Sequence, residues 1–196
     1  MTLVPYGDAA WRIELPARVD RRAVQQLLRR WPGVVDALVT DRHALVCFAP
    51  DHPPPDPRDA MLHATSEKSS APRVHLVRVR YDGPDLAAVA ASLGRTVDEV
   101  IALHARAYEV QLVGFLPGFA YLGPVAPELA SVPRRSSPRP RVPALSVGLA
   151  AGRTGIYPMS SPGGWQLLGT ALDVAPFDPE RGALFALGDR VVIEPA

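Results

Sequence analysis

The feature that most constrains this chain is the division of its second half into short apolar runs by glycine and proline. From Val110 onward these runs are QLVGF, ALSVGLAA, GIYPM, WQLLG and RVVIEP. Each is too short for an ordinary helix and is bounded by residues that favour turns. We therefore expect a compact antiparallel barrel or sandwich in this half. The 22 prolines in 196 residues also argue against an all-helical chain.

Residues 1–80 show the order strand, helix, strand, strand, weak helix, strand. The helix begins at Asp20 and ends before Pro32 and Gly33, and the expected strands cover 10–15, 34–39, 44–48 and 74–79. The proline-rich, charged segment 50–72 predicts a linker with only a weak helix at 60–64. This order is typical of a small ferredoxin-like lobe, which we assign to residues 1–80.

A helix pair at 84–107 opens the second predicted domain, residues 81–196. Pro84 suits a first helical turn, Gly94 ends the first helix, and Thr96 with Glu99 forms a capping-box pattern at the start of the second. A DNA-binding helix-turn-helix is the alternative, but Asp98 and Glu99 at the start of the second helix would repel phosphates. The chain as a whole is predicted to be an α+β protein.

Composition excludes several classes of function. The formal net charge is only +1, so nothing indicates nucleic acid or a membrane surface as a partner. The single cysteine, Cys47, excludes an internal disulfide, and no HExxH or paired-cysteine pattern predicts a metal site. The single lysine, Lys68, lies in the linker, so the lysine of a nucleotide-binding loop is missing. With no signal peptide or apolar span at the N-terminus, we expect a cytoplasmic protein that binds no cofactor itself.

The uncharged segment GFLPGFAYLGP, residues 114–124, is unusual for a soluble domain. Its glycines and prolines are unsuited to a buried strand, and Phe115, Phe119 and Tyr121 are unsuited to a solvated loop. We interpret it as a shaped apolar loop that forms one wall of a pocket.

His104 is the most informative titratable residue, and two interpretations stay open. It can be a buried helix histidine with a satisfied ring nitrogen, or a proton donor or acceptor toward a ligand under the aromatic loop. Ser146 in ALSVG resembles a nucleophile elbow, but no histidine follows it in the sequence, so a hydrolase triad of that kind is excluded.

Residues 129–172 contain five arginines and no acid: Arg134, Arg135, Arg139, Arg141 and Arg153. The segment is either a solvated basic face or a site for a small carboxylate or phosphate. Prolines stiffen it and lower the entropy lost when guanidinium groups are fixed around an anion. SPGGWQLLG, residues 161–169, adds a Gly-Gly turn and an aromatic ring. We expect the aromatic loop and this arginine segment to form one concave, anion-accepting cavity.

The segments GFLPGFAYLG, PRRSSPRPRVPALSVGLAAGRTGIYPMSSPGGWQLLG and YDGPDLAAVAASLGRTVDEVIALHA closely resemble the family of 5-oxoprolinase B-type subunits, also described as allophanate hydrolase subunit 1 or KipI/PxpB. The resemblance covers about residues 78–195. It implies a cyclophilin-like β-barrel after the ferredoxin-like lobe. It also implies a protein that works with a larger C-type subunit and an A-type subunit in ATP-dependent opening of 5-oxo-L-proline to glutamate, the ATP being used by the complex. One branch of the family implies the alternative, a regulatory protein that inhibits a histidine kinase.

The candidate site is drawn from residues that match the family's motifs, with Arg141 added from the arginine segment. His104 is the candidate for proton transfer. The residues expected to bind a small anionic substrate are Phe115, Pro117, Gly118, Phe119, Tyr121, Arg139, Arg141, Ser146, Thr154, Tyr157, Gly163, Gly164 and Trp165. Two positions depart from the family pattern, Leu145 in place of a glycine and Arg153 in place of a glutamine.

Overall fold

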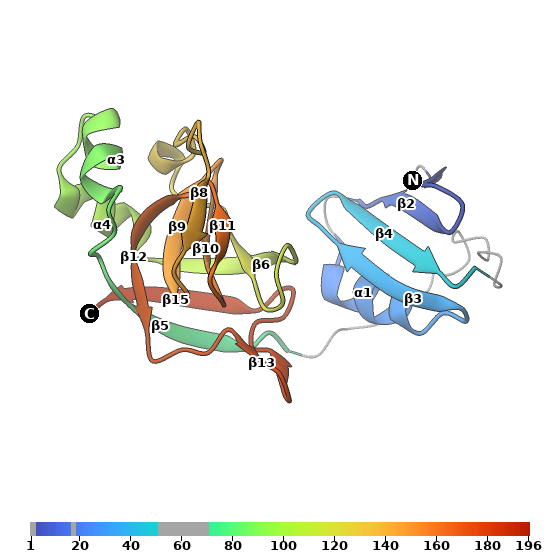
Figure 1. Ribbon diagram of the computed structural model, residues 1–196. Coiled ribbons are helices and arrows are strands. Elements are labelled where there is room, and N and C mark those ends of the chain that lie inside the picture. The colour runs from blue at the N-terminus through green and yellow to red at the C-terminus, as the bar shows by residue number, and fades with distance from the viewer. Residues whose placement is uncertain (1–2, 17–18, 51–70) are drawn as a thin grey trace. The chain divides into compact units, whose positions relative to one another are not determined.

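The computed structural model describes residues 3–16, 19–50 and 71–196, and it divides the chain into two compact units, Met1–Ala71 and Pro72–Ala196. The predicted linker at 50–72, with its weak helix at 60–64, lies almost entirely outside the described residues. The α+β fold with a closed β-barrel that the sequence predicts is confirmed (Figure 1).

The first unit is a four-stranded antiparallel sheet with one described helix. Its elements are β1 (Leu3–Pro5), β2 (Ala10–Glu14), α1 (Arg21–Arg29), β3 (Val34–Val39) and β4 (His43–Phe48). The strand order is β1-β2-β4-β3. The α1 helix begins where the Asp20 carboxylate accepts a hydrogen bond from the Ala23 amide, and it buries Val24 and Leu28. In this sheet β1 takes the edge beside β2, where the fourth strand of a ferredoxin-like fold would pair.

The last strand predicted for the first lobe belongs to the barrel instead. Val74–Val79 lies in β5 (Val74–Arg80), which pairs with the C-terminal strand β15 (Arg190–Pro195) and with β12 (Gln166–Leu172). The assignment of residues 74–80 to the N-terminal lobe was therefore wrong. The boundary between the two units falls between Ala71 and Pro72 in the sequence. The local pattern of a strand carries no information about a partner more than a hundred residues away.

The second unit is a closed barrel with a helix pair. Its remaining elements are α3 (Leu86–Ser92), α4 (Val97–His104), β6 (Ala107–Val113), β7 (Ala120–Gly123), η1 (Pro127–Leu129), β8 (Arg139–Val142), β9 (Ser146–Ala150), β10 (Arg153–Ile156), β11 (Ser161–Gly163), β13 (Phe177–Asp178) and β14 (Gly182–Ala183). Around the barrel the order is β10-β7-β6-β15-β5-β12-β9, and β9 pairs with β10 to close it. The β15–β5 pair is parallel, so the barrel is not wholly antiparallel as the sequence predicted.

The wall of the barrel carries apolar side chains on both faces. Val147 and Leu149 of β9 and Leu168 of β12 belong to the main core, which also takes residues from both helices. Ala150 and Leu167, on the same two strands, belong to a second, aromatic cluster. Because side chains alternate along a strand, one strand serves both clusters, which is why all five residues of β9 are buried.

The helix pair packs on the barrel through one face of each helix. Leu86, Val89 and Ala90 of α3 and Val100 of α4 are buried in the main core. The predicted capping box is present, with reciprocal hydrogen bonds between Thr96 and Glu99. In the described parts of the chain, no helix has the length and apolarity that crossing a bilayer requires.

Candidate functional site

Five aromatic rings from three segments form a cluster centred on Phe119. Its ring makes edge-to-face contacts with Phe115, Tyr121, Tyr157 and Trp165, at centroid distances of 5.6, 5.0, 5.1 and 5.5 Å. Such geometry is the favoured one for aromatic pairs and fixes ring orientations as well as positions. The rings predicted to wall a pocket therefore do lie together.

A cavity of about 260 Å³ opens over this cluster, and we call it the aromatic cavity. The rings of the cluster form one wall, and the arginine segment and the Gly-Gly turn form the rest: Arg134, Arg135, Pro138, Pro162, Gly163 and Gly164. The aromatic loop and the first part of the arginine segment thus share one hollow, as the sequence predicted.

Two backbone features shape this cavity. Phe115 has a positive φ of 73°. The residue is 62% exposed, so it lies at the solvent side of the cavity. A Cβ on Gly163 would lie 2.4 Å from the hydroxyl oxygen of Tyr157, so glycine is required for the close approach of the turn to that ring. A Cβ on Gly164 would meet nothing closer than 3.8 Å.

Arginine side chains give the aromatic cavity its positive charge. Arg134 is exposed and makes no hydrogen bond or ion pair with the described residues. It lies near two phenols: burial raises the pKa of Tyr121 and that of Tyr157, while the charge of Arg134 acts on both in the opposite direction. No acid lines this cavity among the described residues.

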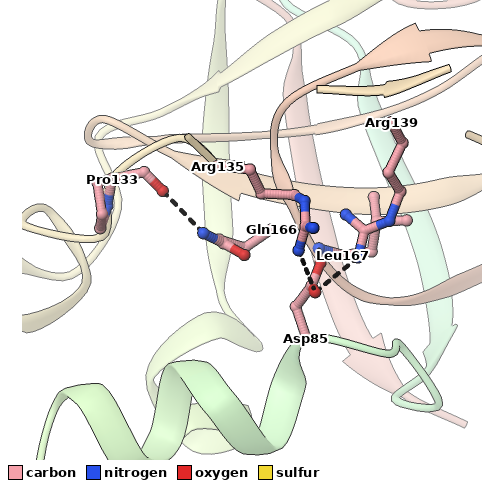
Figure 2. Close-up of polar contacts among 6 residues, drawn as sticks. All are labelled: Asp85, Pro133, Arg135, Arg139, Gln166 and Leu167. Atoms are coloured by element: carbon pink, nitrogen blue, oxygen red, sulfur yellow. Dashed lines mark hydrogen bonds and ion pairs between the residues drawn. The ribbon is translucent and has the colours of Figure 1, made fainter. Parts of the chain in front are cut away.

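Arg135 and Arg139 converge on one carboxylate, Asp85 (Figure 2). Asp85 Oδ1 accepts from Arg139 Nη2 at 2.6 Å and from Arg135 Nη1 at 3.2 Å, and Oδ2 accepts from the Leu167 amide at 2.7 Å. Asp85 precedes α3 but makes no side-chain capping bond there, because both of its oxygens are used by the barrel. We call Asp85, Arg135 and Arg139 the Asp85 triad.

The triad keeps Asp85 ionised although the residue is only 6% exposed. Burial is the largest single influence and raises the pKa of this carboxyl. Hydrogen bonds from Arg139 and Leu167 outweigh burial, with further help from the charges of both arginines, so the pKa lies below its ordinary value.

The other predicted anion-binding residues line a different hollow. A second cavity of about 300 Å³, the arginine cavity, is lined by Arg139, Arg141, Ser146 and neighbouring segments: Asp82, Gly83, Pro84, Pro143, Ala144, Leu167, Gly169 and Thr170. The expected single cavity is therefore two, because Arg135 lines one and Arg139 the other while both bind Asp85.

His104 lies in the barrel core and lines neither cavity. Its side chain is fully buried; Nδ1 lies 2.8 Å from the Tyr81 hydroxyl and Nε2 lies 2.8 Å from the Thr154 hydroxyl. Thr154 donates its own proton to the Gly148 carbonyl at 2.9 Å. The network therefore assigns the proton to Nε2, with Nδ1 accepting from Tyr81.

Burial lowers the pKa of His104 from 6.5 to about 4, so the ring is neutral at physiological pH. With both nitrogens bonded inside the protein, neither is directed at a ligand. Of the two interpretations left open by the sequence, the structure favours the buried core histidine, and Thr154 belongs with it.

The remaining predicted residues take supporting positions. Pro117 is exposed and lines neither cavity, and Gly118, with a positive φ of 77°, packs against the Pro176 carbonyl. Leu145 has a φ of 63°, in the left-handed region that glycine favours, which explains the family's glycine at this position. Sequence reasoning singled out Arg134 and Arg135 only as part of the arginine segment, and it did not select Asp85 or Pro138; the only signal for Asp85 was an acid beside a helix start.

Comparison with known proteins decides the family. A family model described as carboxyltransferase domain, subdomain C and D, matches residues 1–187. The chain is 35% identical to the B-type subunit of 5-oxoprolinase from Haemophilus influenzae over an alignment 206 positions long, which covers 97% of this chain and 96% of that protein. The chain belongs to the family of 5-oxoprolinase B-type subunits.

Two further comparisons each cover only part of the other protein. The chain is 49% identical over 117 residues to the B-type subunit of 5-oxoprolinase from Escherichia coli O157:H7, a stretch that covers 58% of this chain and 52% of that protein, so the match spans about half of that relative. The crystal structure of TTHA0988 superposes with a TM-score of 0.79 at 40% identity, over 95% of this chain and 40% of the other. The family resemblance seen in the sequence is confirmed.

Proposed function

We propose that this chain is the B-type subunit of an ATP-dependent 5-oxoprolinase, which opens the ring of 5-oxo-L-proline to give L-glutamate. The observation that carries the proposal is the aromatic cavity with its two arginines, in a chain that aligns over nearly its whole length with the B-type subunit of a 5-oxoprolinase. The aromatic cavity has a volume of about 260 Å³, just below the roughly 300–1,000 Å³ of pockets for drug-sized ligands. A cavity of this size suits a small cyclic acid.

In this proposal the cavity binds and orients the substrate. The flat lactam ring would pack against Phe115 and Trp165, and its carboxylate would pair with Arg134, whose guanidinium has no competing carboxylate among the described residues. Arg135 would add a second positive charge, and its ion pair with Asp85 would partly neutralise that charge.

The chemistry would be completed by partner proteins. No carboxylate among the described residues lines the aromatic cavity, and His104 is neutral and bonded on both nitrogens. The phenols of Tyr121 and Tyr157 line the cavity, but burial raises their pKa values, so neither is a ready general base there. ATP would be bound and used elsewhere in a complex with C-type and A-type subunits of 5-oxoprolinase.

The test is reconstitution of the complex. The chain, expressed with a C-type and an A-type subunit, should release glutamate and ADP only when 5-oxoproline and ATP are both present. Arg134→Ala should raise the KM for 5-oxoproline at least about ten-fold with little change in kcat, because a charge-assisted bond made equally in ground and transition states is lost.

Arg78→Ala is the matched control, since Arg78 is an exposed arginine paired with Asp173 elsewhere on the barrel. It should leave the KM unchanged. A complete assembly that never hydrolyses ATP in response to 5-oxoproline would reject the proposal, and inhibition of a histidine kinase by the same preparation would favour the regulatory alternative.

A further inference from the structure

The arginine cavity presents two guanidinium groups from one short strand. Arg139 and Arg141 are two residues apart on β8, so they project from the same side of that strand. Pro140 between them fixes its own φ and lacks an amide proton, which limits the ways in which this strand can rearrange. The Arg-Pro-Arg sequence thus places two planar donors side by side.

These two arginines have donors that the protein does not use. Arg139 gives Nη2 to Asp85, but its Nη1 is buried and has no hydrogen-bond partner among the described residues. Arg141 gives Nε to the Ser160 hydroxyl at 3.1 Å, and its two terminal amino groups have no partner in the described part of the chain. A buried donor without an acceptor is costly, which applies to Arg139 Nη1, while the terminal amino groups of the exposed Arg141 lie open to a ligand.

The nearby carboxylates bind other donors and make no hydrogen bond with Arg139 Nη1 or Arg141. Asp82 accepts from Arg80 at 2.6 Å and from Thr170 at 2.9 Å. Asp85 already accepts three hydrogen bonds, two of them from the triad's arginines. Among the described residues that line this cavity, two arginines, Arg139 and Arg141, stand against one carboxylate, Asp82, which is paired with Arg80. The surplus charge is positive.

We propose that the arginine cavity is a second oxyanion site, separate from the aromatic cavity, that takes a carboxylate or phosphate group between Arg139 and Arg141. Planar guanidinium groups match the oxygens of both anions, so the two share one recognition chemistry. The site does not depend on the reaction proposed above, because it is defined by unused donors and surplus charge alone.

The Asp85 triad couples this site to the aromatic cavity. An oxyanion at Arg139 Nη1 offsets part of the positive charge that this guanidinium presents to Asp85 through Nη2, and the carboxylate then interacts more strongly with Arg135 on the side of the aromatic cavity. Anions in the two cavities therefore weaken each other's binding, and the effect is reciprocal. Replacing Asp85 by asparagine removes the competing charge and should tighten anion binding in the arginine cavity.

Isothermal titration of the full chain with inorganic phosphate, and separately with succinate, tests the site. Arg141→Ala should weaken binding of the tighter anion at least about ten-fold, the loss expected for a charge-assisted hydrogen bond. Arg78→Ala, which removes an exposed arginine that pairs with Asp173 and lines neither cavity, should change it by less than about two-fold. Tighter phosphate binding would identify a phosphoryl ligand, and tighter succinate binding a carboxylate.

A second measurement places the anion even if a variant misfolds. In amide NMR spectra of the unmodified chain, phosphate or succinate should shift the signals of Gly83 and Gly169, which line the arginine cavity, more than those of Gly163 and Gly164, which line the aromatic cavity. Shifts confined to Gly163 and Gly164, equal binding by Arg141→Ala and the unmodified chain, or no binding of either anion would overturn the proposal.

Discussion

Two of the buried polar networks of the barrel unit, one around Asp85 and one around His104, differ in almost every respect. The Asp85 network is ionised, lies between two solvent-accessible cavities and leaves arginine donors unused. The His104 network is neutral, closed and fully bonded, from Tyr81 through His104 and Thr154 to the Gly148 carbonyl. The difference teaches that a buried titratable group suggests function only where its bonding is incomplete and a cavity reaches it.

The largest expected effect separates the Asp85 network from ordinary surface ion pairs. Asp85→Ala should lower the free energy of unfolding by about 3–5 kcal/mol, because it leaves two partly buried guanidinium groups without their carboxylate. Asp82→Ala, which removes the nearby carboxylate of an exposed pair with Arg80, should cost about 0–1 kcal/mol. Urea denaturation at pH 7 measures both, and equal losses would show that Asp85 is no more than a surface charge.

The two networks should also respond to acid in different pH windows. Burial lowers the pKa of His104 from 6.5 to about 4 in the folded chain. Between pH 6.5 and pH 4 this histidine therefore takes up a proton in the unfolded chain and stays neutral in the folded chain. Stability should therefore fall by about 3 kcal/mol as the pH drops from 6.5 to 4. Asp85 has a lowered pKa, so its contribution is complete above about pH 3.9 and is lost only below it.

His104→Gln isolates the first window. Urea denaturation at intervals between pH 7 and 4 should show this part of the slope in the unmodified chain and not in the variant, since glutamine does not titrate. Parallel curves for the two proteins would mean that His104 is protonated in the folded state, and the interpretation of its network as neutral would be wrong.

The smallest expected effect tests whether the His104 network is held by hydrogen bonds or by packing. Thr154→Val should lower the free energy of unfolding by about 1–3 kcal/mol, because the proton on His104 Nε2 loses its acceptor. Thr154→Ser keeps the hydroxyl and loses one methyl group, at about 1 kcal/mol or less. If only the burial of apolar surface mattered, Thr154→Val would be more stable than Thr154→Ser. Thermal unfolding that ranks the two variants in this order would contradict the proposed hydrogen-bond network.

Sequence patterns predicted those features whose causes are local. The capping box of Thr96 and Glu99 and the short apolar runs of the barrel needed only neighbouring residues, and the aromatic loop brought its own rings together. The strand at 74–79 was placed in the wrong unit because its partner is β15, at the other end of the chain. The arginine segment contains no acid, but its counterion, Asp85, lies about fifty residues upstream. Long-range pairing of this kind leaves no trace in a local pattern.

The closed network around His104 bears on which barrel the chain builds. Thr154 lies on β10, opposite Leu149 of β9 and Leu122 of β7. If β10 slipped by one residue against these neighbours, its hydroxyl would turn to the other face of the wall, and His104 and the Gly148 carbonyl would both be left unbonded in an apolar interior. The hydrogen bonds that join Tyr81, His104, Thr154 and the Gly148 carbonyl therefore destabilise any barrel that closes in a shifted register. Their main contribution is to make the native register the single favoured one.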